Sequence, residues 1–156
     1  MLLGGAAFAL EEGPYVPTPQ PVVDKILSMG RVGPKDYLID LGSGDGRIVV
    51  TAAKRFGARG FGVDWSEQLV DKARALAKAQ GVAERAQFFK QDVFETDISK
   101  ATVITLYMLP DTNLALRPRF LDLLRPGTRI VAHDYDMGDW RPDEHVRMAA
   151  PGKTVG

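Results

Sequence analysis

The clearest indication of the fold is the segment Tyr37-Leu-Ile-Asp-Leu-Gly-Ser-Gly-Asp-Gly-Arg47. Its first half is a short apolar run that leads into a carboxylate and then glycines, which is typical of a buried parallel strand. The segment that follows, residues 47–56, has apolar residues at helical spacing and is closed by Gly57. The stretch therefore predicts a strand, a tight glycine-rich turn and a helix, in that order.

The same alternation continues along the chain. Gly60-Phe-Gly-Val-Asp64 is a second apolar run that ends in a carboxylate, and Ser66 is a suitable N-cap for a helix that Gly81 ends. Further strands are predicted at 86–91, 101–107 and 128–133, further helices at 21–29 and 114–124, and one more short strand is an option at 145–149. Strands that alternate with helices through short connections form right-handed βαβ units. We therefore predict an α/β, Rossmann-like fold, a mainly parallel sheet with helices on both faces.

The residues before this region differ from the rest. Residues 1–10 are apolar and lack a basic residue, and residues 11–21 hold four prolines, which exclude a helix or a central strand there. The apolar end is either the tail of a longer secretion signal or an N-terminal arm. We expect residues 1–13 to be such an arm or signal remnant, and residues 14–156 to be a single domain.

Composition narrows the classes of function. The chain has 20 Lys and Arg residues and 20 Asp and Glu residues. A protein that binds nucleic-acid phosphates usually carries an excess of basic residues, so we expect no nucleic-acid partner. The chain has no cysteine, which excludes disulfides, thiolate metal sites and a cysteine nucleophile. No apolar run reaches the ~18 residues of a transmembrane segment. No spacing of histidines and carboxylates indicates a metal site.

The glycine-rich loop and a later acid together indicate an adenosine-type ligand. Gly42, Gly44 and Gly46 let the backbone approach a ligand closely, although a tight turn also needs such glycines for structural reasons alone. Asp64 lies 20 residues after Gly44, at the predicted end of the second strand, where a carboxylate accepts from both ribose hydroxyls. The alternative for Asp64 is a turn or cap, but Ser66 already serves as the cap.

The spacing and charge of the loop discriminate between two such ligands. A dinucleotide site reads G-x-G-x-x-G, which places a pyrophosphate at the helix N-terminus, whereas this loop reads G-x-G-x-G. Asp40 and Asp45 would repel a pyrophosphate, but they favour the ammonium and sulfonium of S-adenosylmethionine. We therefore expect S-adenosylmethionine rather than NAD as the cofactor.

Two further positions fit the adenine. Trp65 directly follows the ribose acid and is placed to pack on the base, unless it is an ordinary core or rim tryptophan. Asp92 follows the third strand and is placed to accept from the adenine amino group, unless it forms a solvated turn.

With these motifs the chain resembles the class I S-adenosylmethionine methyltransferases, through Asp40-Leu-Gly-Ser-Gly-Asp-Gly-Arg47, Gly62-Val-Asp64 and Gln91-Asp-Val-Phe94. Three other segments resemble the small protein-lysine methyltransferase family: Pro14-Tyr-Val-Pro-Thr-Pro19, Thr105-Leu-Tyr-Met-Leu-Pro110 and His133-Asp-Tyr-Asp-Met-Gly-Asp-Trp140. Its mitochondrial members modify the c-subunit of ATP synthase and the adenine nucleotide translocase. The resemblance covers about residues 14–143 and implies a protein substrate that presents a lysine. Class I enzymes usually have seven strands, so we expect the last strands to be incomplete here.

The resemblance also implies roles for single residues. Tyr15 and Thr18 would close over the cofactor from the N-terminal segment. Asp92 and Val93 would hold the adenine. Tyr107, at the end of the fourth strand, would meet the methyl acceptor. The methionine end would be held by Asp40, Gly42 and Gly44. Ser43 and Asp45 of the same loop are further candidates to bind the cofactor.

Transfer of a methyl group from a sulfonium needs alignment and a neutral acceptor, and no metal. Tyr107 and Tyr135 are candidates to line a channel that lowers the pKa of a lysine amine, although Tyr107 also fits a core position. Asn113 and Asp134 are candidates to hold the acceptor, with helix capping and turn formation as their alternatives, and His133 is a weaker candidate base.

Two other classes of function remain open at this point: a small-molecule methyltransferase of the same fold, and a non-catalytic NAD-type binding module. No lid insertion is evident, which favours an open site for a protein side chain. We expect the protein in the cytoplasm, where S-adenosylmethionine is found.

Overall fold

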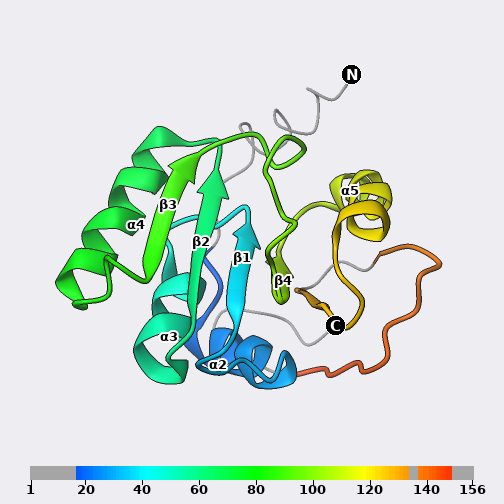
Figure 1. Ribbon diagram of the computed structural model, residues 1–156, viewed down its shortest axis with the longest axis horizontal. Helices are drawn as coiled ribbons and strands as arrows, with labels where there is room; N and C mark the ends of the chain where they lie inside the picture. Colours follow the sequence, from blue (N-terminus) through cyan, green and yellow to red (C-terminus); the bar gives the residue numbers. More distant parts are fainter. Residues whose placement is uncertain (1–16, 134–136, 149–156) are drawn as a thin grey trace.

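The computed structural model describes residues 17–133 and 137–148, and a parallel sheet forms its centre (Figure 1). The strand order is β3-β2-β1-β4-β5, and every neighbouring pair is parallel. The predicted α/β, Rossmann-like architecture is confirmed, whereas the arm predicted at residues 1–13 lies outside the described residues. The strands are β1 (Tyr37–Leu41), β2 (Arg59–Asp64), β3 (Ala86–Lys90), β4 (Val103–Leu106) and β5 (Arg129–Ala132).

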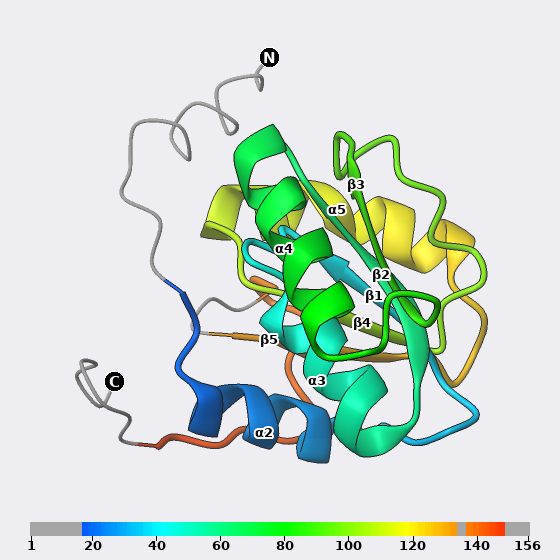
Figure 2. The same cartoon turned by 90° about the vertical axis from the view of Figure 1, so that its left-hand side faces the viewer.

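The helices cover both faces of this sheet. Helices α2 (Gln20–Met29), α3 (Arg47–Phe56) and α4 (Glu67–Ala79) pack on one face, and α5 (Pro110–Leu123) packs on the other (Figure 2). Each face has its own apolar core, and successive strand residues such as Leu38 and Ile39 belong to opposite cores. Burial on both faces explains why β1 and β4 are almost continuously apolar. None of the helices in the described ranges is long and apolar enough to cross a membrane.

Most predicted boundaries agree with the structure to within two residues. Ser66 is the N-cap of α4, as predicted, because its Oγ accepts the N–H of Leu69 at 3.2 Å. Helix α5 begins at Pro110, earlier than the predicted residue 114, since proline is favoured in a first helical turn. The optional strand at 145–149 is wrong for residues 145–148, which have no regular structure. After β5, the described residues form no further strand of the sheet.

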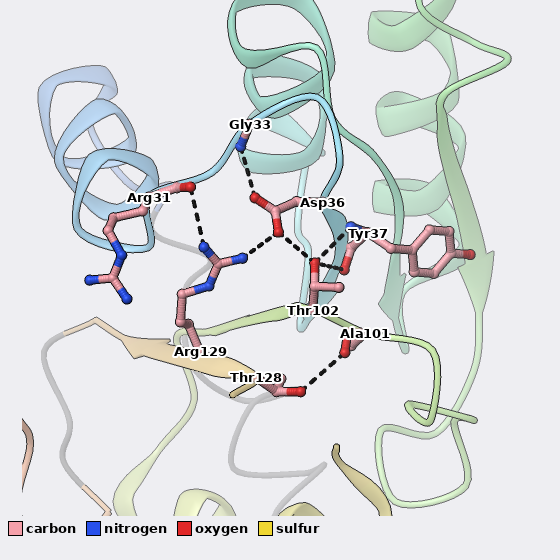
Figure 3. Close-up of polar contacts among 8 residues, drawn as sticks. All are labelled: Arg31, Gly33, Asp36, Tyr37, Ala101, Thr102, Thr128 and Arg129. Carbon is pink, nitrogen blue, oxygen red and sulfur yellow. Dashed lines mark hydrogen bonds and ion pairs between the residues drawn. The ribbon is translucent and has the colours of Figure 1, made fainter. Parts of the chain in front are cut away.

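One carboxylate ties together the amino ends of β1, β4 and β5 (Figure 3). Asp36 accepts hydrogen bonds from the backbone N–H of Gly33 at 2.8 Å and from Oγ1 of Thr102 at 2.7 Å, and it pairs with the guanidinium of Arg129. Thr102 in turn accepts the N–H of Tyr37 at 2.8 Å. This cluster holds the strands at the edge where they begin, which leaves the opposite edge for the candidate site.

Candidate functional site

The predicted site residues gather at the edge of the sheet where the strands end. Because all strands are parallel, the residues that follow β1, β2, β3 and β4 lie at this one edge. The chain proceeds from β1 to β2 and β3 on one side and then continues with β4 and β5 on the other, so the winding reverses between β1 and β4. In open α/β sheets, ligands bind at such a switch point.

The glycine-rich loop after β1 is shaped by its neighbours. The N–H groups of Gly42 and Ser43 both donate to the carbonyl oxygen of Val63 at 2.9 Å. Gly46 has a φ of 87°, and a Cβ at this position would lie 2.6 Å from the Cβ of Ala73 on α4. The loop therefore needs glycine for its own packing, in addition to any contact with a ligand.

Asp64, the last residue of β2, holds this loop from the side. Its Oδ2 accepts the N–H of Gly44 at 2.9 Å, and its Oδ1 accepts the N–H of Ser66 at 3.0 Å. A carboxylate oxygen has two lone pairs, so each oxygen retains the capacity to accept one more hydrogen bond. The half-buried side chain is thus suited to the ribose hydroxyls that the sequence assigned to it.

Asp40 on β1 has a buried carboxyl group, 2% exposed. Its Oδ1 accepts the hydroxyl hydrogen of Thr105 on β4 at 2.8 Å, and its Oδ2 has no hydrogen-bond partner among the described residues. Burial raises the pKa of Asp40 to about 7; the Thr105 hydrogen bond opposes this rise, and the charges of Asp64 and Asp45 add to it. A buried carboxylate oxygen without a partner is unfavourable, and a cationic group placed against it would remove the penalty.

Asp45 has a different partner from the one that the sequence suggested. Its carboxylate pairs with the guanidinium of Arg47, with Nη2 to Oδ2 at 2.5 Å and Nε to Oδ1 at 3.0 Å. Nη1 of Arg47 donates to the backbone carbonyl of Thr18 at 2.9 Å. The negative charge of Asp45 is therefore balanced by Arg47, and the pair connects the loop to the segment before α2, from which Thr18 was predicted to reach the cofactor.

The predicted adenine residues lie after β2 and β3. Trp65 is 52% exposed, which excludes a core position, and the ammonium of Lys90 lies 5.8 Å from its ring centre. Asp92 forms the turn that was its alternative role, since its Oδ1 accepts the N–H of Phe94 at 2.8 Å. Val93 is half-buried and packs against the core on the α5 side of the sheet.

The predicted acceptor residues lie after β4. Tyr107 is half-buried, and its ring centre is 4.3 Å from that of His133, whose Nδ1 lies 3.4 Å from Oγ1 of Thr18. Asn113 is fully buried inside α5, whose N-cap is Leu109, so the capping alternative for Asn113 is wrong. Three residues assigned from the sequence lie outside the described residues: Tyr15, Asp134 and Tyr135.

Two residues that sequence reasoning did not single out belong to this site. The role of Arg47 had a signal, because a cation two residues after Asp45 across a glycine is well placed to pair with it. No signal in the sequence indicated the role of Thr105, because its hydrogen bond to Asp40 follows from the register between β1 and β4, in which the two residues are partners.

A parallel sheet with this switch point, a G-x-G-x-G loop and an acid at the end of β2 define a class I S-adenosylmethionine-dependent methyltransferase. The family described as ANTKMT methyltransferase domain matches residues 40–144, from the loop to beyond β5. The chain belongs to this family. Membership decides against an NAD-type binding module, which was one of the alternatives from the sequence.

The chain is similar to two relatives of known name and to one solved structure. A protein-lysine N-methyltransferase of Saccharolobus islandicus (strain REY15A) is 41% identical over 136 residues, which cover 86% of this chain and 84% of that protein. A human lysine N-methyltransferase named for the c-subunit of ATP synthase is 31% identical over 133 residues, 85% of this chain. A crystal structure of an RNA methyltransferase from Salinibacter ruber in complex with S-adenosyl-L-homocysteine has a TM-score of 0.83 and 53% identity, over 90% of each chain. The chain spans only 56% of the human protein's length.

Proposed function

We propose that this protein transfers a methyl group from S-adenosylmethionine to a lysine side chain of another protein. The observation that carries the proposal is the 41% identity to the archaeal protein-lysine N-methyltransferase, over 86% of this chain and 84% of that one. The site supports it, because the half-buried Tyr107 and the buried His133 form a ring pair after the ends of β4 and β5, on the same sheet edge as the glycine-rich loop.

The described residues fit the cofactor. Oδ2 of Asp40, buried and without a partner among them, is suited to the cofactor's ammonium, and the glycine-rich loop would hold the rest of the methionine end. Asp64 would accept from the ribose hydroxyls, and Trp65 with Asp92 would flank the adenine. When bound, the cofactor supplies an electrophilic methyl carbon that is already activated by the adjacent sulfonium.

The protein's task toward the acceptor is to supply a neutral amine in line with that carbon. A lysine ammonium has an ordinary pKa of about 10.4, and burial beside aromatic rings lowers it because the charged form loses hydration. Tyr107 and His133 provide such surroundings. The lysine ammonium would lose one proton to solvent on entering these surroundings. Its neutral nitrogen would then accept the methyl group that bound S-adenosylmethionine supplies, which would leave a methylated ammonium and S-adenosylhomocysteine.

A second candidate is methylation of RNA, which is favoured by the 53% identity to the Salinibacter protein named as an RNA methyltransferase. The equal numbers of basic and acidic residues, 20 each, argue against a phosphate-binding surface. We therefore favour a protein partner over a nucleic acid, with residues 14–156 as the catalytic domain and a cytoplasmic location. A small-molecule acceptor is the third class to be tested.

One labelling experiment separates these acceptors. The purified full chain is incubated with S-adenosylmethionine labelled in its methyl group and with a lysate of the source cells, which is untreated, treated with ribonuclease, or chemically blocked at lysine amines. We expect label in protein, insensitive to ribonuclease and lost after the lysine block, with methyl-lysine identified by mass spectrometry. Label that ribonuclease removes would establish the RNA candidate, and label only in the low-molecular-weight fraction would establish a small-molecule acceptor.

A variant ties the activity to the proposed acceptor site. Tyr107→Ala should lower the labelling rate at least tenfold, since one misplaced acceptor group has effects of this order, and it should leave the binding of S-adenosylhomocysteine unchanged. Thr128→Val is the matched control and should leave both unchanged, because Thr128 lies before β5 at the edge where the strands begin, and its hydroxyl donates to the carbonyl of Ala101 at 3.3 Å (Figure 3).

A further inference from the structure

We infer that Thr105 is a positioning residue for the aminoacyl end of the cofactor, and that it acts through Asp40. The two residues are register partners on neighbouring strands, Asp40 on β1 and Thr105 on β4. Thr105 is 1% exposed, and its hydroxyl donates to Oδ1 of Asp40 at 2.8 Å. This inference rests on the S-adenosylmethionine site and does not depend on which acceptor the protein methylates.

The first consequence of this hydrogen bond is orientation. The terminal torsion of an aspartate side chain is broad, so without a partner the carboxylate of Asp40 would rotate between several positions. With Oδ1 bound to Thr105, the plane of the carboxylate is fixed, and Oδ2 is the oxygen that stays without a partner among the described residues. A fixed acceptor binds an ammonium at a lower entropic cost than a mobile one.

The second consequence concerns charge. Burial of Asp40 and the nearby acids Asp64 on β2 and Asp45 in the loop all raise the pKa of Asp40, and the Thr105 hydrogen bond lowers it. The guanidinium of Arg47 on α3, paired with Asp45, offsets part of that negative surrounding. Without the hydroxyl, Asp40 would be protonated to a higher pH, and a neutral carboxyl attracts an ammonium less strongly.

Ligands that differ only in the amino-acid part distinguish this role from a general structural one. S-adenosylhomocysteine carries the ammonium that Asp40 would bind, whereas 5′-methylthioadenosine has the same nucleoside without it. A residue that acts through Asp40 affects the first ligand and spares the second. A residue that only supports the sheet affects both ligands equally.

The experiment is titration calorimetry of the full chain with both ligands between pH 6 and pH 9. Thr105→Val, which has nearly the same shape and no hydroxyl, should weaken S-adenosylhomocysteine about 10- to 100-fold, the range for a hydrogen bond to a charged group. It should change the affinity for 5′-methylthioadenosine less than about twofold. The affinity for S-adenosylhomocysteine falls as the pH is lowered, and in this variant that fall should begin at a higher pH. Thr105→Ser, which keeps the hydroxyl, should restore the wild-type affinity. Thr128→Val, which removes a hydroxyl at the opposite edge of the sheet, should match the wild type.

The contrary results are equally specific. An equal loss for both ligands would reduce Thr105 to a structural residue, and an unchanged affinity and pH profile would remove any role. Failure of the wild type to bind S-adenosylhomocysteine would refute the cofactor site itself, which is a distinct outcome. If Thr105→Val does not fold, Thr105→Ala carries the same test. In the wild type, the Asp40 carboxyl carbon signal in NMR must shift with S-adenosylhomocysteine and not with 5′-methylthioadenosine, or the inference fails.

Discussion

The backbone N–H of Gly44 donates to Oδ2 of Asp64 at 2.9 Å, so the carboxylate suited to the ribose also holds the loop that shapes the site. The other oxygen of Asp64 accepts the N–H of Ser66, the residue that caps α4. One side chain thus joins the β1 loop to the start of α4 in the ligand-free protein. Loss of Asp64 is therefore expected to affect stability as well as binding.

Asp64→Ala should lower the free energy of unfolding of the ligand-free protein by about 1–3 kcal/mol, because it leaves the N–H groups of Gly44 and Ser66 without this acceptor. Asp64→Asn keeps one acceptor oxygen and should cost less. Urea unfolding measures both effects. Asp24→Ala, which removes a carboxylate from an exposed pair with Arg55, is the control and should change stability by less than about 1 kcal/mol. Equal stability of Asp64→Ala and the wild type would show that the loop does not depend on this bond.

Asp40 should give the protein a distinctive dependence of stability on pH. Its folded-state pKa of about 7 lies above the ordinary value of 3.8, so between these values the folded state binds more protons than the unfolded state. The contribution of Asp40 therefore destabilises the protein above pH 7, and this penalty fades as the pH falls toward 4. Asp40→Asn should raise the Tm of the ligand-free protein at pH 8 by a few degrees, on the order expected for 1 kcal/mol, and the gain should vanish near pH 4.

The same variant should weaken S-adenosylhomocysteine at pH 8, so that stability and binding change in opposite directions. Asp97→Asn is a control whose effect on stability should have the opposite sign, because the hydrogen bonds from Ser99 lower the pKa of the exposed Asp97 carboxylate. It should lower the Tm slightly at neutral pH. A Tm for Asp40→Asn below that of the wild type at pH 8 would contradict the assigned environment of Asp40.

Two glycines with similar backbone angles should respond differently to alanine. Gly46 (φ 87°) faces Ala73 and Phe88, where a Cβ would lie 2.6 Å and 2.8 Å from side-chain atoms, whereas Gly81 (φ 73°) has nothing within 4 Å. Gly81→Ala should cost about 1–2 kcal/mol from the left-handed backbone alone. Gly46→Ala should lower the free energy of unfolding by that amount and by about 1–3 kcal/mol more, because the added Cβ overpacks the site. Urea unfolding of the two variants checks the difference, and equal losses would refute the steric argument.

The cluster around Asp36 should matter for stability and leave binding intact, since it lies at the edge where the strands begin (Figure 3). Asp36→Ala leaves Arg129, Thr102 and the N–H of Gly33 without their shared acceptor and should cost about 3–5 kcal/mol, as breaking a mostly buried pair does. The affinity for S-adenosylhomocysteine of the folded fraction should equal that of the wild type. A loss of affinity would show coupling between the two edges of the sheet.

The sequence predicts the parts of this molecule that depend on local chemistry. The strand–turn–helix of residues 37–56 and the Ser66 cap follow from apolar periodicity, glycine and a hydroxyl at the right position, and the structure has them. Contacts between distant segments could not be foreseen, because they depend on register and packing. The bond between Thr105 and Asp40 and the support of the loop by Asp64 are of this kind. The charge argument from the sequence also counted Asp45 as free for a ligand, although Arg47 balances it.

Trp65 offers a direct optical test of how the adenine binds. It is 52% exposed and follows Asp64 at the site edge, whereas Trp140, the other tryptophan of the chain, lies with its ring 5.9 Å from the guanidinium of Arg117. Binding of S-adenosylhomocysteine should change the tryptophan emission of the wild type, and Trp65→Phe should abolish that change. Trp65→Ala should weaken binding about 5- to 100-fold, the range for loss of stacking on one base.

Trp65→Ala should lower the affinity for 5′-methylthioadenosine by the same factor, because both ligands carry the same base. Thr105→Val, in contrast, should lower only the affinity for S-adenosylhomocysteine. Lys90→Met is the control for the ammonium beside the ring and should alter the unliganded emission without altering affinity. An emission change that survives in Trp65→Phe would place the ligand nearer to Trp140. An unchanged affinity of Trp65→Ala would show that the adenine is held by the residues after β3 alone.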